Sequence, residues 1–299
     1  MIERIRRPGL KPKMRAHRKY RRVVWFLIVI SGTTSSGTAA AFTTASHKQD
    51  RSASTSLTPA QLEIEKQRTR LSTSDIEERR DALMRLRSMH NPEASRAALQ
   101  GLRDAEAIVR ATAAEAILSL PPAESAANLI PLLNDKDEFV RREAAYALGN
   151  TRNRTAVSFL VERLLSDKID AVRAAAAVAL GEIGDETAVS SLAAVLNPQS
   201  ALPLKRSKKS KKSENPFVLR AAARSLGQIR SRVGLPALIA VLNDERAEND
   251  VRRESAFALG AVGDSSALPA LREAVTHADP YLSQAAHEAI RKILRSNSQ

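Results

Sequence analysis

Few residues in this chain have side chains and spacings that could support catalysis or bind a metal. There is no cysteine, which excludes thiolate zinc sites and cysteine nucleophiles. No G-x-x-x-x-G-K phosphate loop is present, and nothing places a serine beside a histidine and a carboxylate. The five histidines are scattered, and only His287 is followed by a glutamate, Glu288. One His-Glu pair cannot complete a metal's coordination shell, so we expect no catalytic residue, no metal and no cofactor.

The strongest candidate for binding is a basic run inside an insertion at residues 198–214. The cationic side chains, separated by serines, are Lys205, Arg206, Lys208, Lys209, Lys211 and Lys212. Like charges at this density repel one another and stay solvated, which favours a solubilising loop. The alternative interpretation is a tether for an anionic partner: acidic lipid headgroups, an acidic protein or a nucleic acid. No aromatic residue interrupts the run, so base stacking is not supported.

The net charge of +14 is confined to two segments. Residues 1–22 carry a net charge of +9, and the insertion 198–214 carries +5. The rest of the chain is therefore neutral. A groove that grips nucleic acid normally carries a basic stripe, so this balance argues against nucleic acid as the partner of the main body.

The N-terminal segment has the layout of a secretory signal peptide. Its basic start is followed by the apolar run VVWFLIVI at residues 23–30 and by small residues that include an A-x-A pattern at 39–41. Met14 is an alternative start that would shorten the basic leader. If it is not cleaved, the segment 23–42 is just long enough to span a bilayer. We expect the protein to be extracytoplasmic, periplasmic or secreted, or anchored in the inner membrane through residues 23–42.

A helical unit repeats along the remainder of the chain. One apolar position recurs in each unit: Leu86, Ile117, Leu148, Leu180, Leu226, Leu259 and Ile290. Successive gaps are 31, 31, 32, 46, 33 and 31 residues, so one insertion of about 15 residues interrupts a regular array. Each unit of such a solenoid buries its apolar face only by stacking on its neighbours.

These features divide the chain into a leader (1–42), a linker (43–57), a solenoid (58–295) and a tail (296–299). Thr58 and Pro59 predict the first helix start, and Ser74 with Glu77 predicts a capping box at the next. Glycines directly after the recurring apolar residue are expected to end the helix at Gly149, Gly181, Gly227 and Gly260.

An arginine recurs seven residues before the apolar position in five units, at Arg79, Arg110, Arg141, Arg173 and Arg252. An acidic residue stands three or four positions before that arginine in several units, as at Asp137, Asp170 and Glu248. We expect these side chains to form a hydrogen-bonded ladder between adjacent repeats, with a structural rather than a ligand-binding role.

The pattern D-x-x-V-R-x-x-A-A-x-A-L-G-x-I-G-D over residues 74–294 resembles the short HEAT repeat of phycobilisome lyases, the PBS lyase HEAT-like repeat. The resemblance implies an all-α, armadillo-type superhelical solenoid of about seven helix pairs. That family includes bilin–phycobiliprotein lyases and deoxyhypusine hydroxylase. The hydroxylase holds a di-iron centre with four His-Glu pairs, so its activity does not carry over to a chain with one pair.

We expect a non-catalytic scaffold that binds a protein partner along its repeat surface. One alternative is an accessory enzyme of the bilin lyase type acting on a phycobiliprotein. A second is binding of anionic lipid or nucleic acid through the basic run.

Overall fold

The computed structural model describes residues 57–197 and 214–296, which belong to one compact unit made of helices and turns. The α-helices are α1 (Pro59–Arg70), α2 (Ile76–Ser88), α3 (Pro92–Ala98), α4 (Ala107–Ala116), α5 (Pro122–Leu129), α6 (Glu138–Thr151), α7 (Val157–Ser166), α8 (Asp170–Ile183), α9 (Val189–Leu196), α10 (Pro216–Ile229), α11 (Leu235–Asn243), α12 (Asn249–Val262), α13 (Leu268–Val275) and α14 (Pro280–Ser296). Short 3-10 helices are η1 (Leu99–Arg103), η2 (Ile130–Asn134), η3 (Arg154–Ala156), η4 (Glu186–Ala188), η5 (Arg232–Gly234) and η6 (Ser265–Ala267).

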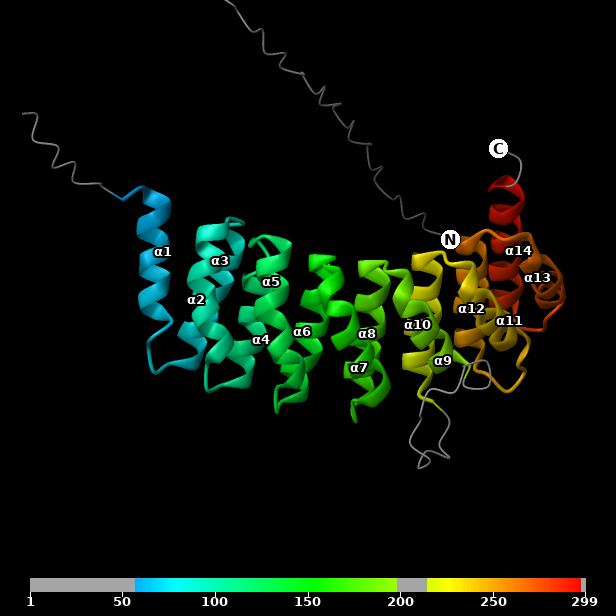
Figure 1. Ribbon diagram of the computed structural model, residues 1–299, viewed down its shortest axis with the longest axis horizontal. Coiled ribbons are helices and arrows are strands. Elements are labelled where there is room, and N and C mark those ends of the chain that lie inside the picture. Colours follow the sequence, from blue (N-terminus) through cyan, green and yellow to red (C-terminus); the bar gives the residue numbers. More distant parts are fainter. Residues whose placement is uncertain (1–56, 198–213, 297–299) are drawn as a thin grey trace, which may run out of the picture. The chain divides into compact units, whose positions relative to one another are not determined.

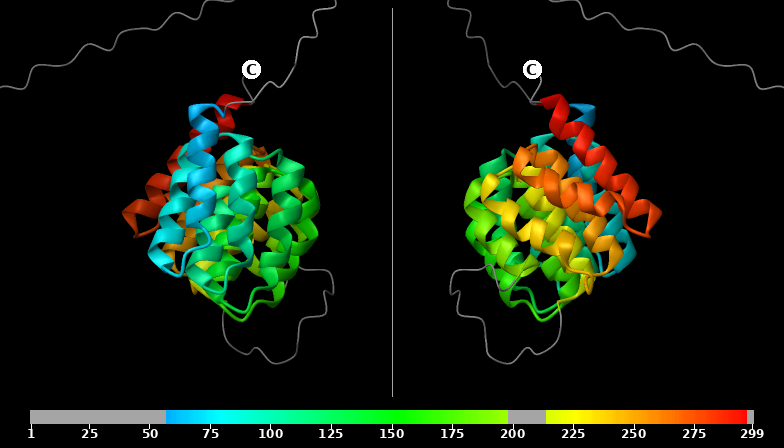
Figure 2. Two further views of the ribbon diagram at one scale, coloured as in Figure 1. Left: turned by 90° about the vertical axis from the view of Figure 1, so that its left-hand side faces the viewer. Right: turned by 90° about the vertical axis from the view of Figure 1, so that its right-hand side faces the viewer.

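The helices follow one another in chain order along a row of antiparallel pairs, as Figure 1 shows. Figure 2 views the row from its two ends, with α1 nearest in one panel and α13 and α14 nearest in the other. The all-α solenoid expected from the repeat is therefore confirmed for the described residues.

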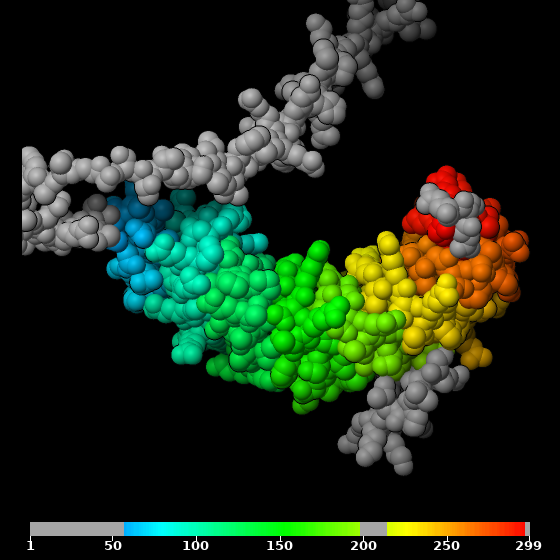
Figure 3. All heavy atoms as spheres, turned by 45° about the horizontal axis from the view of Figure 1, so that its top comes forward, coloured from blue at the N-terminus to red at the C-terminus, as the bar shows by residue number. Residues whose placement is uncertain are grey.

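The helices fall into two layers that pack differently. The tight layer comprises α2, α4, α6, α8, α10, α12 and α14, which contact one another extensively from unit to unit. The open layer comprises α1, α3, α5, α7, α9, α11 and α13, whose helices contact their tight-layer partners more than one another. Closer spacing on one side bends a stack of repeats toward that side, and Figure 3 shows the row bent.

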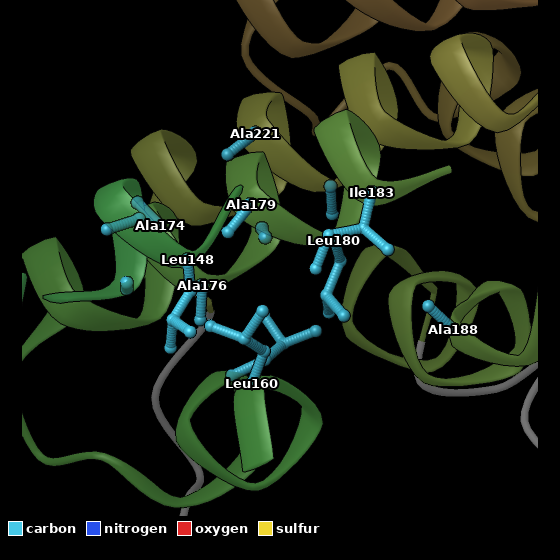
Figure 4. Close-up of a cluster of buried hydrophobic side chains, with 14 of the residues drawn as sticks. Leu148, Leu160, Ala174, Ala176, Ala179, Leu180, Ile183, Ala188 and Ala221 are labelled. Atoms are coloured by element: carbon cyan, nitrogen blue, oxygen red, sulfur yellow. The ribbon is translucent and has the colours of Figure 1, made fainter. Parts of the chain in front are cut away.

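The core between the layers is built from aliphatic side chains. The recurring leucines Leu148, Leu180, Leu226 and Leu259 are buried, and alanines fill the spaces between them. In Figure 4, Leu160 of the open-layer helix α7 lies against Leu148 and Ala176 of the tight layer. Each buried leucine contributes about 1.5–3 kcal/mol of hydrophobic stabilisation.

The expected role of the four glycines as helix stops is wrong. The helix continues past each of Gly149, Gly181, Gly227 and Gly260, because all four lie inside tight-layer helices. Helices α8 and α12 end instead at left-handed glycines three residues later, and α6 and α10 end at left-handed arginines. The four internal glycines are instead sites of close approach between helices: a Cβ on Gly227 would lie 2.8 Å from Cα of Ala258.

The predicted helix starts are partly confirmed. Thr58 caps α1, and Gln61 completes a capping box with it. At α2 the cap is Asp75 rather than Ser74, because the Asp75 carboxylate accepts hydrogen bonds from the backbone N–H groups of Glu77 and Glu78 at 2.9 and 3.4 Å. A carboxylate at this position also interacts favourably with the helix dipole.

Several sequence predictions fall outside the described residues. They include the signal or anchor segment at 23–42, most of the linker, and the basic residues from Lys205 to Lys212. Within the two described stretches, no helix combines the length and apolarity that crossing a bilayer requires.

Candidate protein-interaction surface

The solvent face of the tight layer is set by residues seven positions apart on each helix. Seven residues make almost two turns, so such pairs point in nearly the same direction. We call this surface the tight-layer face. Its pairs include Phe139 and Tyr146 on α6, Phe217 and Arg224 on α10, Asp250 and Phe257 on α12, and Tyr281 and Glu288 on α14.

The described aromatic side chains lie outside the buried core: Phe139 and Tyr146 are partly buried and pack against it, and the other four are exposed. The structure describes six, and none belongs to the buried core: Phe139, Tyr146, Phe159, Phe217, Phe257 and Tyr281. Five of them lie on the tight-layer face, and Phe159 lies on the open-layer helix α7. Phe217 and Tyr281 are 61% and 66% exposed. The close packing of alanine and glycine leaves no space for an aromatic ring in the core. The rings on the tight-layer face therefore do not serve to fill the core, and their position needs a different explanation.

Three of these rings are stacked by arginines. The guanidinium carbon of Arg142 lies 4.8 Å from the ring centre of Phe139, and that of Arg220 lies 5.1 Å from Phe217. Arg253 lies 5.4 Å from the ring centre of Tyr281 on the next tight-layer helix. A cation over an exposed aromatic face contributes about 0.5–1 kcal/mol, which holds the rings in defined orientations.

The arginines on this face are also matched by carboxylates. Arg220 lies 3.4 Å from Asp250, and Arg224 forms two hydrogen bonds with Glu254 at 2.9 and 3.0 Å. The hydrogen bonds that Arg224 donates to Glu254 are the main reason that the pKa of Arg224 is raised. The face therefore combines exposed rings with largely balanced charge.

Between the rings of α6 and α10 lies a smooth stretch of the tight-layer face. The α8 positions equivalent to the aromatic pair of α6 are Ala171, which is exposed, and Val178, which is partly buried, and neither carries a charge or much bulk. This stretch forms a low apolar floor flanked by aromatic side chains on both neighbouring tight-layer helices.

The recurring arginines lie at the edge of the array, where tight-layer helices begin. Each of the first three forms a bidentate pair with an aspartate in the turn before the next tight-layer helix: Arg79 with Asp104, Arg110 with Asp135 and Arg141 with Asp167, at 2.8–3.1 Å. Each also donates to backbone carbonyls of its own preceding turn, at Thr73, Asp104 and Asp135 respectively. Every such guanidinium therefore clamps two successive turns together.

The last two ladder arginines have different partners. Arg173 reaches across the insertion to Glu214, with two hydrogen bonds of 2.6 Å. Arg252 donates to the carbonyl of Leu242 at 2.9 Å, and its Nη1 lies 2.9 Å from Nε2 of His277.

The acidic residues that the sequence placed in the ladder have other contacts. Asp137 caps α6 by accepting from the N–H of Phe139, and Asp170 accepts from the side chain of Asn215 at 2.7 Å. Asp170 also lies 3.6 Å from Arg173, a longer contact than the Glu214 pair. Glu248 precedes α12 without a side-chain capping bond. Each of the first three arginines, seven residues before the recurring apolar position, is directed toward the following turn, which explains why the nearer acids are not its main partners.

The ladder aspartates predict how the protein responds to acid. Burial, the largest single influence, disfavours the charged forms of Asp135 and Asp167. The hydrogen bonds from Arg110 and Arg141, together with backbone hydrogen bonds and nearby positive charge, outweigh it, so both pKa values are lowered. A lowered folded pKa gives stability that is complete above the unfolded value of about 3.9 and is lost as the pH falls through the folded pKa. We expect the melting temperature to change little between about pH 7 and 5 and to fall steeply below about pH 4. In Arg141→Ala the melting temperature should fall less steeply with decreasing pH than in the wild type. An identical pH dependence in both proteins would show that the pair of Arg141 with Asp167 does not cause the loss of stability in acid.

The remaining chemical candidates are dispersed. His287 is exposed on α14, and Glu288 beside it accepts a 3.4 Å contact from Gln284. Within residues 57–197 and 214–296, no group of three or more His, Asp or Glu side chains is placed to hold a metal ion. The aromatic face was missed by the sequence analysis, although the seven-residue spacing of Phe139 and Tyr146 was a visible signal.

Comparison with known proteins agrees with the repeat assignment. The HEAT-repeat model matches residues 64–144, 95–170, 126–207 and 245–298, and the PBS lyase HEAT-like repeat model matches residues 218–244. No curated protein gives a match to the sequence.

Several solved structures have a similar chain path. The complex of CpcE and CpcF of phycocyanin lyase from Nostoc sp. PCC7120 is 23% identical, with 81% of this chain and 93% of that chain covered and a TM-score of 0.46. Human deoxyhypusine hydroxylase is 20% identical, with 78% and 96% covered and a TM-score of 0.39. A designed armadillo repeat protein in complex with the peptide (KR)4 is 20% identical, with 77% and 99% covered and a TM-score of 0.39. Likeness at this level carries no information on activity or partner.

The family itself follows from the repeat matches, which agree with the stacked helix pairs and their recurring leucines. They extend over most of the chain from residue 64 to residue 298. The chain belongs to the HEAT-repeat family.

Proposed function

We propose that this chain is a protein-interaction scaffold that binds a partner protein along its tight-layer face. The observation that carries the proposal is the position of the aromatic side chains, five of which lie on that face and none in the core. Exposed aromatic rings in one region are the usual mark of a protein-binding surface.

The arginines beside the rings support the same function. Tyrosine and arginine are enriched among the residues that contribute most to protein–protein affinity. The stacks of Arg142 on Phe139 and Arg220 on Phe217 hold both groups in place before a partner arrives. Preorganised side chains lose less conformational entropy on binding, which increases affinity.

The charge balance of the face favours a protein over a nucleic acid. Arg220 and Arg224 already pair with carboxylates, so they do not form the unpaired basic stripe that tracks a phosphate backbone. Export or anchoring through residues 23–42, and anion binding by residues 205–212, stay predictions from the sequence.

Photo-crosslinking from two equally exposed rings on opposite layers tests the proposed function. Phe257 on the tight-layer face is 39% exposed, and Phe159 on the open layer is 41% exposed, so they form a matched pair. We expect a photoreactive phenylalanine at position 257 or 217 of the full chain, expressed in cells, to give one discrete protein adduct. The same substitution at position 159 should give none. Adducts of equal yield from both layers, or none from 217 and 257, would contradict a binding role for this face.

A further inference from the structure

Each internal glycine of the tight layer creates a notch between two neighbouring helices. At two of these notches the protein fills the space with a side-chain oxygen. A Cβ on Gly149 would overlap Oε2 of Glu182, and a Cβ on Gly181 would overlap Oε1 of Gln228. Glu182 and Gln228 each follow directly after the glycine of their own helix, so the two notches are filled by equivalent positions.

The notch at Gly227 has no such oxygen over it because the equivalent position on α12 is an alanine, although Gly227 itself is buried against Ala258. Ala261 follows Gly260 as Glu182 follows Gly181, but its methyl group is too short to cover Gly227. The result is a cavity of about 460 Å³ on the tight-layer face between α10, α12 and α14. Gly227, Ala258 and Ala261 line it together with one ring of the candidate surface, Phe257.

The cavity is lined by more positive than negative charge. Arg224, Arg230, Lys292 and Glu254 all contribute to its wall, and Glu254 is already paired with Arg224 through two hydrogen bonds. Neither Arg230 nor Lys292 forms an ion pair with any residue in the described stretches. Two cations are therefore available to a group that enters from solvent.

The filled notch at Gly149 shows that a glutamate side chain fits the space, even where no ion pair within the described stretches stabilises its charge. The Oε2 atom of Glu182 is buried there without a hydrogen-bond partner, and burial raises the pKa of this carboxyl while Arg152 opposes the shift. Arg152 ends α6 in the left-handed conformation, with φ of 50°, and Arg230 ends α10 in the same way, with φ of 59°. The open notch thus has the glycine and the arginine of the filled one but lacks the carboxylate.

We propose that the Gly227 notch binds a glutamate side chain of the partner protein, in the place that Glu182 takes over Gly149. This inference rests on the proposed function and names one anchor of the partner. The carboxylate lies over Gly227 with Arg230 and Lys292 as counter-charges, and the methylene groups contact the ring of Phe257. Gln228 shows that an amide also fits such a notch, so the two unpaired cations are what select a carboxylate here.

A short peptide probes the notch directly. The probe is the acetylated and amidated peptide Gly-Ser-Leu-Glu-Leu-Ser-Gly, titrated into the isotope-labelled full chain and followed by backbone amide chemical shifts. We expect saturable shifts at Gly227, Arg230 and Ala261, and at least about tenfold weaker binding when glutamine replaces the central glutamate. Arg230→Ala should weaken binding by about tenfold or more, whereas the equivalent cap variant Arg152→Ala should leave it unchanged. Equal binding of both peptides, or shifts spread over the whole surface, would overturn the inference.

Ala261→Glu provides a second arm, because it supplies the missing carboxylate from within the chain. The equivalent residue of α8 is a glutamate, so the fold accommodates this change. We expect Ala261→Glu to abolish binding of the glutamate peptide and to reduce crosslinking from position 217, with Ala261→Ser unchanged in both. If crosslinking from 217 persists in full in Ala261→Glu and the peptide does not bind the wild type, the inference is wrong and the scaffold function stands. If neither position 217 nor position 257 gives an adduct in the wild type, the scaffold function itself is wrong.

Discussion

Replacing Arg141 by alanine is expected to destabilise the protein by about 3 kcal/mol or more. The reason is the environment of its partner: the Asp167 side chain is only 2% exposed and receives two hydrogen bonds from Arg141. Without the guanidinium of Arg141, Asp167 keeps one backbone hydrogen bond from Ile169 and a long ion pair with Arg163 at 3.9 Å. Removing one partner of a buried pair costs far more than the pair itself contributes. Urea unfolding followed by circular dichroism at 222 nm measures the loss.

Arg154→Ala is the matched control for this prediction. Arg154 also pairs with an aspartate, Asp185, but its side chain is 80% exposed and the distance is 3.4 Å. Exposed pairs contribute about 0–1 kcal/mol, so this variant should unfold close to the wild type. The double variant Arg141→Met with Asp167→Asn should be less destabilised than Arg141→Met alone, because it leaves no unpaired charge. An Arg141→Ala loss no larger than that of Arg154→Ala would show that the ladder is solvated.

The repeat architecture was predictable because it is repeated in the sequence. The positions of Leu148, Leu180, Leu226 and Leu259 fixed the helices that carry them, and all four are buried as expected. Each unit buries the equivalent apolar residue against its neighbours. One apolar residue at a constant spacing therefore reveals the stacking of many helices.

The ladder partners were harder to predict because acidic residues stand on both sides of several of the arginines in the sequence. Asp137 stands four residues before Arg141, and Asp167 stands 26 residues after it. Sequence proximity favoured the first, whereas the structure pairs Arg141 with the second. Choosing between them requires the position of the next turn in space, which depends on how closely successive helices stack.

The aromatic face could have been found, but composition concealed it. Aromatic residues make up only 3% of the chain, which indicates that they contribute little to the core and says nothing of their position on the surface. The same few rings become informative once Phe217 and Phe257 are placed on the solvent side of their helices. The Gly227 notch is different, because it depends on a missing side chain at Ala261, and only the filled notches elsewhere in the array reveal that absence.

Replacing Gly227 by leucine is expected to destabilise the protein by about 3 kcal/mol, although leucine has the higher helix propensity. Leucine is a better helix former than glycine by nearly 1 kcal/mol in an exposed helix interior, so a helix-stop or purely local role predicts little loss or a gain. The packing predicts the reverse, since a Cβ at this position would lie 2.8 and 2.9 Å from Cα and Cβ of Ala258. Helix α12 would have to move away from α10, which separates two units of the array.

Gly184→Ala distinguishes close approach from backbone strain, the other common reason for a glycine. Gly184 ends α8 with φ of 71°, and the nearest atom to an added Cβ is 4.0 Å away. The methyl group of an alanine there would contact no other atom closely, so the only loss of stability comes from the left-handed backbone, about 1 kcal/mol. Urea unfolding should therefore place Gly184→Ala between the wild type and Gly227→Leu. If Gly227→Leu is instead as stable as the wild type, α10 and α12 are not in close contact at this point, and the notch proposed as a glutamate pocket loses its floor.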